Sequence, residues 1–207
     1  MRLTPPTRQE LLASRLSDDE TQFFISHGAA VDPTVVVRGQ RPIIQNSLGS
    51  SLRIGAHCVI NSDNDTSFVP ISSRVKFALG RGAEIVIGNH SDLNGCCISS
   101  YEHIEIGSYV QIGPSTWITD TDLHAVDPSV RRAQLEGRPY DWASVARSPV
   151  VIEDDVWLGS NVVVLKGVRI GHGSVIGIGS IVSCDIPPMS IAAGNPARVI
   201  KQIPSRD

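Results

Sequence analysis

The sequence predicts an all-β fold in which the chain winds as a β-helix, a prism of stacked triangular coils, with helices before it and one long loop extruded from it. Branched aliphatic residues recur at every sixth position near the C-terminus: Ile152, Leu158, Val164, Ile170, Ile176 and Val182. The position four residues after each of them is also small or aliphatic: Val156, Val162, Val168, Ser174, Ser180 and Ile186. This period fits neither the repeat of an α-helix, about 3.6 residues, nor the alternation of a simple strand, whereas three hexapeptides form one coil of about 18 residues.

The same register returns upstream, at Ile106, Ile112 and Ile118, at Ile87 and Leu93, and at Ile54 and Ile60. We expect each aliphatic side chain to point into the prism and the residue four later to fill a small inward slot. These slots include Cys58, Ser91 and Cys97, and the register slips by one residue between Cys97 and Ile106. Because a single coil cannot bury its own interior, the coils must stack and pair with their neighbours.

Two short helices are expected before the first coil. Thr7 and Glu10 form a capping-box pattern, and Ser17 and Glu20 repeat it before a second apolar cluster that ends at Gly28. In such a box the hydroxyl and the carboxylate satisfy backbone donors at the start of a helix.

One long stretch, residues 119–149, lacks the sixfold register and is rich in charged residues. Long loops in compact domains are usually functional or disordered, and Tyr140 and Trp142 suggest that this one docks against the rest of the protein. The predicted organisation is therefore a helical segment (1–30), a first part of the β-helix (31–118), the extruded loop (119–149), the final coils (150–186) and a C-terminal tail (187–207).

Composition restricts the class of protein further. The chain has 207 residues, of which 41% are hydrophobic and 19% charged, as in a folded globular protein. Its formal net charge of -3 argues against nucleic acid as a partner. No apolar run is long enough for a membrane span, and the N-terminus lacks the apolar stretch of a signal peptide, so we expect a cytoplasmic protein. The cysteines, Cys58, Cys96, Cys97 and Cys184, form no C-x-x-C pair and are expected to be free thiols.

Neither a metal nor a dinucleotide site is expected. The six histidines show no close pairing, and no cysteine pair supports a structural zinc. The glycines around Gly171 and Gly177 fall in register as turn residues and do not form a phosphate-binding loop.

Three segments together resemble a known family: Ile118-Thr-Asp-Thr-Asp-Leu-His124, Val156-Trp-Leu-Gly-Ser-Asn161 and Ala193-Gly-Asn-Pro-Ala-Arg-Val-Ile-Lys201. They are similar to the hexapeptide-repeat acyltransferases, and most of all to the galactoside, maltose and polysaccharide O-acetyltransferases. The resemblance implies a left-handed parallel β-helix. It also implies acetyl-CoA as co-substrate and a homotrimer that holds it in the grooves between neighbouring prisms.

The resemblance further implies that His124 is the general base of a direct acetyl transfer, without an acyl-enzyme. Imidazole suits this role because it exchanges a proton near neutral pH. Asp120, Asp122 and Asp127 are candidates to orient that imidazole, and the sequence does not choose among them. Asn94 is the candidate for binding the acceptor.

For the donor, the resemblance places backbone contacts at Ser160 and Ile178 and phosphate contacts at Arg198 and Lys201. Ser183 occupies a further cofactor position, although many relatives have Thr-Lys where this chain has Ser183-Cys184. One ammonium group that relatives place there is therefore missing.

The predicted function is transfer of an acetyl group from acetyl-CoA to a hydroxyl of a sugar or saccharide precursor. N-acetylation of an amino sugar and acetylation of a xenobiotic remain open, since no residue separates an amine from a hydroxyl acceptor. An alternative of another class is a non-catalytic β-helix that serves as an assembly module.

Overall fold

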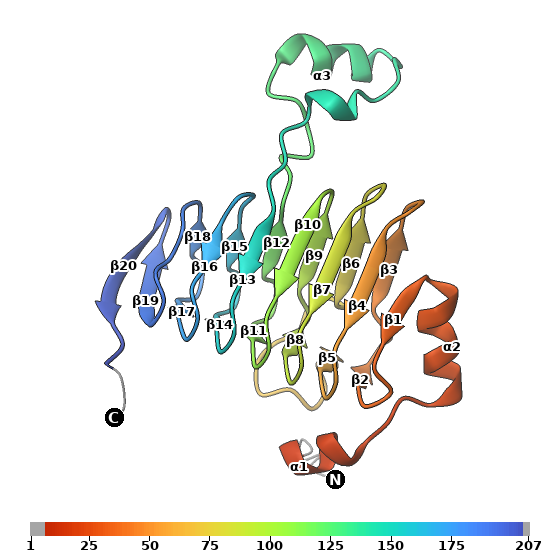
Figure 1. Cartoon of the computed structure of the whole chain (residues 1–207), viewed down its shortest axis with the longest axis vertical. Helices are drawn as coiled ribbons and strands as arrows, with labels where there is room; N and C mark the ends of the chain where they lie inside the picture. Colours follow the sequence, from red (N-terminus) through yellow and green to blue (C-terminus); the bar gives the residue numbers. More distant parts are fainter. Residues whose placement is uncertain (1–6, 205–207) are drawn as a thin grey trace.

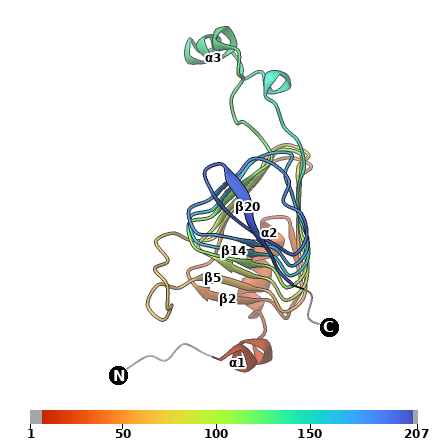
Figure 2. The same cartoon turned by 90° about the vertical axis from the view of Figure 1, so that its left-hand side faces the viewer.

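The computed structural model describes residues 7–204 and confirms the predicted fold class, a left-handed parallel β-helix. Three sheets form the sides of a triangular prism, which Figure 2 shows nearly end-on. The strands of each coil pair with the equivalent strands of the coils before and after it. Every such pair in the described residues is parallel, except the last one.

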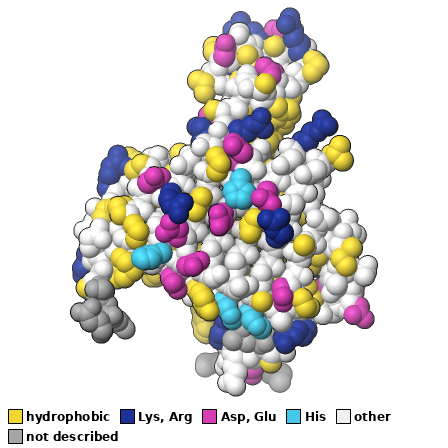
Figure 3. Space-filling model, viewed as in Figure 1, with side chains coloured by type: hydrophobic (Ala, Val, Ile, Leu, Met, Phe, Trp, Pro, Cys, Tyr) yellow, Lys and Arg dark blue, Asp and Glu magenta, His cyan; other side chains and the backbone are white. Residues whose placement is uncertain are grey.

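Sheet A contains, in spatial order, β1 (Ala29–Val31), β4 (Ser51–Ile54), β7 (Glu84–Ile87), β10 (His103–Ile106), β13 (Val150–Ile152) and β16 (Arg169–Ile170). Its outer face is polar, and Figure 3 shows acidic, basic and histidine side chains interspersed over it. Glu84 lies 2.8 Å from Arg53 and 3.1 Å from His103, and Arg169 Nε donates to Glu153 over 2.8 Å. Sheet A is therefore built to face water.

Sheet B contains β2 (Val36–Gly39), β5 (Val59–Ser62), β8 (Asp92–Asn94), β11 (Gln111–Ile112), β14 (Trp157–Leu158), β17 (Val175–Ile176), β19 (Ser190–Gly194) and β20 (Ala197–Gln202). Sheet C contains β3 (Ile43–Asn46), β6 (Lys76–Leu79), β9 (Cys97–Ser100), β12 (Trp117–Thr119), β15 (Val163–Val164) and β18 (Ile181–Val182).

The sixfold aliphatic residues form the core of the prism, as the sequence predicts. Ile106 pairs in register with Ile87 and Ile152, and Ile152 pairs with Ile170. All six aliphatic positions from Ile152 onward are fully buried, and so are the six slots four residues later. Each fully buried aliphatic side chain contributes about 1.5–3 kcal/mol relative to an exposed one, so the repeat itself supplies the core.

One prediction about the inward slots is wrong. Ile98 pairs with Ile118 and is buried, so it lies five residues after Leu93 and eight residues before Ile106, and the register departs from six on both sides of it. Cys96 therefore fills the inward slot, while Cys97 lies on the outward side of β9, half-buried beside Trp117. The error at Cys97 followed from counting in sixes, because Ile98 comes one residue earlier than that count.

The N-terminal helices are α1 (Arg8–Ala13) and α2 (Asp18–Ser26), and both predicted capping boxes are present. Helix α2 lies against the first coil and buries Phe24 there, so it covers one end of the prism (Figure 1). None of the described helices is long and apolar enough to cross a membrane.

The segment predicted as a C-terminal tail contains two strands of the prism. Strand β19 pairs in parallel with β17, and β20 turns back and pairs with β19 in antiparallel fashion. The sequence prediction missed them because the spacing between Val182 and Ser190 departs from six. Ile191 pairs with Val175 and Ala192 with Ile176, so sheet B continues past the last hexapeptide.

The long loop rises as an arm, defined here as residues 120–149, from the corner between sheets C and A (Figures 1 and 2). It carries helix α3 (Pro128–Leu135) and the short 3-10 helix η1 (Trp142–Ser144). Its two ends are joined by a bridge between Thr121 and Arg147. Helix α3 buries none of its residues, and sheet B lies on the side of the prism opposite this corner.

Candidate active site

The root of the arm is fixed by a buried carboxylate. Asp120 is fully buried and accepts hydrogen bonds from the Ser100 hydroxyl at 2.7 Å and from the backbone N–H groups of Tyr101 and Glu102 at 2.7 and 2.9 Å. A buried carboxylate is tolerated only when its acceptors are satisfied in this way. Asp120 therefore holds the preceding turn of the prism against the base of the arm.

His124 lies four residues further along the arm, with its imidazole exposed. Its Nδ1 lies 3.2 Å from the Tyr140 hydroxyl, and that hydroxyl donates its proton to the Leu123 carbonyl. A tyrosine hydroxyl has one proton, so the oxygen can only accept from His124. This network assigns the proton to Nδ1 and leaves the Nε2 lone pair free.

The other two candidate aspartates have partners of their own. Asp122 accepts from Lys166 Nζ at 2.6 Å, and this ion pair places the carboxylate outside the core. Asp127 caps helix α3 and accepts from the Ser129 backbone and hydroxyl, both at 2.8 Å, and these bonds lower the pKa of Asp127. Within residues 7–204, none of the three candidates hydrogen-bonds to His124.

Asn94 lies at the end of β8 on sheet B. It accepts from Asn61 at 2.9 Å and donates to the Ile112 carbonyl at 3.1 Å. It lines a groove of about 530 Å³ together with Ser160 and the half-exposed Trp157. The structure thus brings Asn94 and Ser160 into one cavity, which the loop of Phe68 and Val69 overhangs.

Ser160 and Ile178 occupy stacked turns at the corner between sheets B and C. The Gly179 N–H donates to the Ser160 carbonyl at 2.9 Å, and Ile178 is 73% exposed. A side chain at Gly159 would put its Cβ 2.8 Å from the Ile178 nitrogen. Glycine is thus required for this close stacking, which leaves a narrow edge of backbone amides along the prism.

The late basic residues lie on β20. Arg198 pairs in register with Ala193 and Lys201 with Ile191, and both side chains are exposed. Neither makes an ion pair within the described chain. Arg198 Nη1 lies 3.8 Å from Cys184 Sγ, in the turn that also contains Ser183. Two unneutralised cations at this end of the prism fit a ligand with phosphate groups.

The candidate residues therefore form two groups on one chain. His124 belongs to the arm, which leaves from the corner between sheets C and A, whereas Asn94 and the groove belong to sheet B on the opposite side (Figure 2). No cavity described in the structure includes both.

The cysteines are unsuited to nucleophilic chemistry, except for the exposed Cys184. Burial raises the pKa of Cys58 to about 11 and that of Cys96 to about 12, and it also raises the pKa of Cys97. These thiols therefore stay protonated near neutral pH. Among the described residues, no group of three or more His, Cys, Asp or Glu side chains could hold a metal ion.

The partners of these groups do not follow from the sequence. Tyr140 is expected there only as an aromatic residue that docks, and no motif points to Tyr101 or Ser100. Tyr140 follows His124 by 16 residues with no repeat to link them, and only the fold of the arm brings them together. No signal in this single sequence could have found that contact.

Comparison with known proteins gives the following relatives. Residues 149–184 match the family model of the bacterial transferase hexapeptide (six repeats). The chain is 38% identical over 133 residues to a galactoside O-acetyltransferase of Escherichia coli K12, which covers 64% of this chain and 60% of the relative. The chain thus spans less than two thirds of the length of that relative.

Two solved structures are similar over most of the chain. The polySia-specific acetyltransferase NeuO has a TM-score of 0.64 at 26% identity, covering 86% of this chain and 69% of the other. A hexapeptide-repeat-containing acetyltransferase of Vibrio cholerae O1 biovar eltor, solved as a complex with acetyl coenzyme A, has a TM-score of 0.53 at 28% identity, covering 96% and 84%. The resemblance to hexapeptide-repeat acetyltransferases that the three sequence segments indicate is confirmed.

Proposed function

We propose, from this family resemblance and the geometry of the site, that the protein transfers an acetyl group from acetyl-CoA directly to a hydroxyl group of a saccharide. The observation that carries the proposal is the hydrogen-bond network of His124. An exposed imidazole with its proton held on Nδ1 offers Nε2 as a base at the foot of the arm.

The proposed reaction needs only one proton acceptor. His124 Nε2 removes the proton from the acceptor hydroxyl as its oxygen attacks the carbonyl carbon of the acetyl thioester. The C–O bond forms, the C–S bond breaks, and the sulfur leaves with the proton that the imidazole returns. Tyr140 positions the imidazole and accepts from Nδ1 throughout, so no carboxylate has to contact His124.

The donor fits the other group of residues. The backbone edge at Ser160 and Ile178 suits an extended pantetheine arm, and Arg198 and Lys201 offer two cations to phosphates. Ser183 lies in the turn next to Arg198 and adds a hydroxyl. Asn94, in the groove that Ser160 shares, is proposed to hold the acceptor.

The separation of His124 from that groove supports a homotrimer as the active form. In such an assembly the arm of one chain brings His124 to the sheet B groove of its neighbour, and each site then has two walls. We place this assembly in the cytoplasm, where acetyl-CoA is available as the donor.

The direct test is an acetyl-transfer screen over sugars, amino sugars and hydroxylated antibiotics. The release of free thiol from acetyl-CoA measures the transfer. On a confirmed acceptor, His124→Ala is expected to lower turnover by about 10² to 10⁴, the usual contribution of a positioned base. Acetyl-CoA affinity, measured by calorimetry, is expected to stay unchanged.

His172→Ala is the matched control, because His172 is also exposed but lies at another corner of the prism. It is expected to keep wild-type turnover. If His124→Ala retained more than a tenth of the wild-type rate, His124 would not be the base. If amines alone were acetylated, the acceptor class would be corrected to an amino group, and saturable acetyl-CoA binding without any transfer would favour an assembly module.

A further inference from the structure

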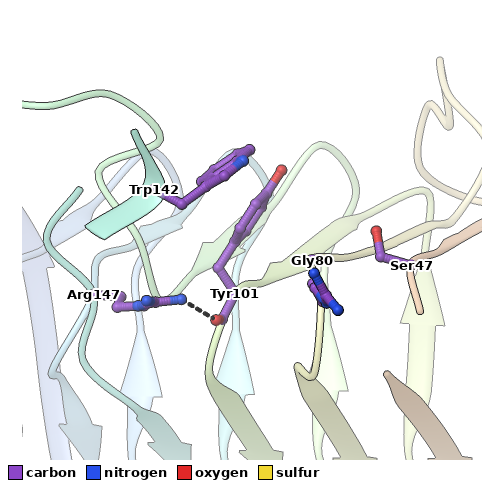
Figure 4. A pocket seen from close by; sticks show the side chains of 6 residues that line it. Ser47, Gly80, Tyr101, Trp142 and Arg147 are labelled. Carbon is purple, nitrogen blue, oxygen red and sulfur yellow. Dashed lines mark hydrogen bonds between the residues drawn. The ribbon is translucent and has the colours of Figure 1, made fainter. Parts of the chain in front are cut away.

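A second cavity lies beside the foot of the arm and is separate from the sheet B groove. It measures about 460 Å³, within the range of about 300–1,000 Å³ that small-molecule sites occupy. Figure 4 shows it from close by, lined by Ser47, Gly80, Arg81, Tyr101, Trp142 and Arg147. Four of these come from three successive turns of the prism at the corner between sheets C and A, and two come from the returning side of the arm.

One wall of the cavity is a stack of aromatic rings. The Tyr101 and Trp142 rings lie 4.7 Å apart at 26°, and the Tyr140 ring follows Trp142 at 4.2 Å. Trp142 is nevertheless 42% exposed, so the stack does not bury its face completely. Through Tyr140 the stack leads to His124.

The prism is shaped to admit this stack. A side chain at Gly80 would put its Cβ 2.5 Å from Tyr101 Cδ1 and 2.9 Å from Cε1, so the Tyr101 ring occupies space that any other residue would fill. The buried Asp120 carboxylate accepts a hydrogen bond from the Tyr101 backbone N–H and so fixes the turn that carries Tyr101. Both features fix an aromatic surface at the mouth of the cavity.

The same cavity has two positive charges and no acidic residue in its lining. Arg147 Nη1 donates to the Tyr101 carbonyl at 3.2 Å, the bond drawn in Figure 4, and this neutral partner leaves its charge uncompensated. Arg81 has no side-chain hydrogen bond or ion pair within residues 7–204. A guanidinium group without an acidic partner favours a carboxylate or a phosphate as ligand, which it binds in a bidentate manner.

We infer that this cavity binds an anionic saccharide, a sugar unit with a carboxylate or phosphoryl group. The negative face of an aromatic ring attracts the C–H groups of a sugar ring, and the two arginines bind its anionic substituent. That the bound sugar belongs to the acetyl acceptor rests on the proposed function. The ring stack from Trp142 to His124 then places a neighbouring hydroxyl of the acceptor at the base.

The test measures equilibrium binding to the full chain without acetyl-CoA, by calorimetry. The probes are matched sets that differ only in charge: galactose, galacturonate and galactose 6-phosphate; N-acetylglucosamine and its 6-phosphate; lactose and sialyllactose. At least one acidic member is expected to bind tenfold or more tightly than its neutral counterpart. The galactose set separates carboxylate from phosphate as the preferred anion.

Variants then assign the preference to this cavity. Arg81→Gln with Arg147→Gln is expected to abolish it, while Trp142→Ala weakens the neutral and the acidic member alike and Trp142→Phe restores most of the binding. Arg132→Gln on exposed helix α3 is the matched control and is expected to change nothing. Equal affinity for charged and neutral members, or a preference that survives in the double arginine variant, would overturn the inference.

Acetyl transfer to the same probes separates this inference from the proposed function. Charge-selective binding without transfer to any probe would leave the cavity assignment standing and refute the acetyltransferase proposal. Transfer at equal rates to charged and neutral members, with no difference in affinity, would support the acetyltransferase proposal and refute the cavity assignment.

Discussion

Two aspartates two positions apart in the chain have opposite environments. Asp120 is fully buried and accepts three hydrogen bonds, whereas Asp122 pairs with Lys166 at the surface, where both side chains are about one third exposed (33% and 32%). Both are candidates from the sequence because both precede His124 closely. The structure gives the first a role in holding the arm and the second a surface ion pair.

We expect Asp120→Asn to destabilise the protein by about 3 kcal/mol, since the amide group leaves at least one N–H or hydroxyl donor without its acceptor. Asp122→Asn removes an ion pair that solvent screens, so its cost should stay below about 1 kcal/mol. Urea unfolding of both variants and of the wild type measures these two losses in the free energy of unfolding. Similar losses for the two would contradict the assignment of Asp120 as the anchor of the arm.

At the scale of elements, the β19–β20 hairpin links the end of the fold to the proposed donor site. Strand β20 carries both Arg198 and Lys201, which are exposed and have no acidic partner in the described chain. Replacing both with Ala should weaken acetyl-CoA binding at least tenfold, which corresponds to about 1.4 kcal/mol.

Calorimetric titration with acetyl-CoA is the measurement for this double variant. Arg53→Ala with Arg169→Ala, on sheet A, changes the net charge by the same amount and serves as the control. If the two double variants lost the same affinity, the effect would come from net charge and the phosphates would lie elsewhere.

For the whole molecule, the proposed trimer predicts complementation between defective chains. His124→Ala lacks the base and Asn94→Ala lacks the acceptor contact, so each alone should show little activity. If a site combines His124 of one chain with Asn94 of the next, co-refolding equal amounts should restore about one quarter of the sites by random assortment.

Sedimentation provides the accompanying measurement, with an expected mass of about three times the 22.2 kDa of one chain. Mixing the two folded variants without dissociation is the control and should restore nothing. A mixture that stays inactive after co-refolding, while sedimenting as a trimer, would place both residues of each site on a single chain.

The repeat allowed most of this fold to be predicted because the prism uses one physical rule many times. Ile152, Val156 and their equivalents are buried as expected, since period six matches one strand and one turn. The errors fall where a local count departs from six, at Cys96 and Cys97 and again at β19.

The site was less predictable than the fold. His124 and Asn94 follow from motifs, but the partners of His124 depend on how residues 120–149 fold back, and the arm has no periodicity. Tyr140, Trp142 and Tyr101 come from two distant segments whose contact is a tertiary event. A pattern of spacing cannot encode such a contact.

The reversal at β20 also bears on aggregation. A stack of parallel coils has no natural limit, because the last strands of each sheet present unpaired N–H and C=O groups to any similar chain. Helix α2 covers the first coil, and β20 runs against the direction that a further parallel coil would need. Polymerisation end to end is thereby opposed at both ends, and the molecule keeps a fixed length although its repeat does not specify one.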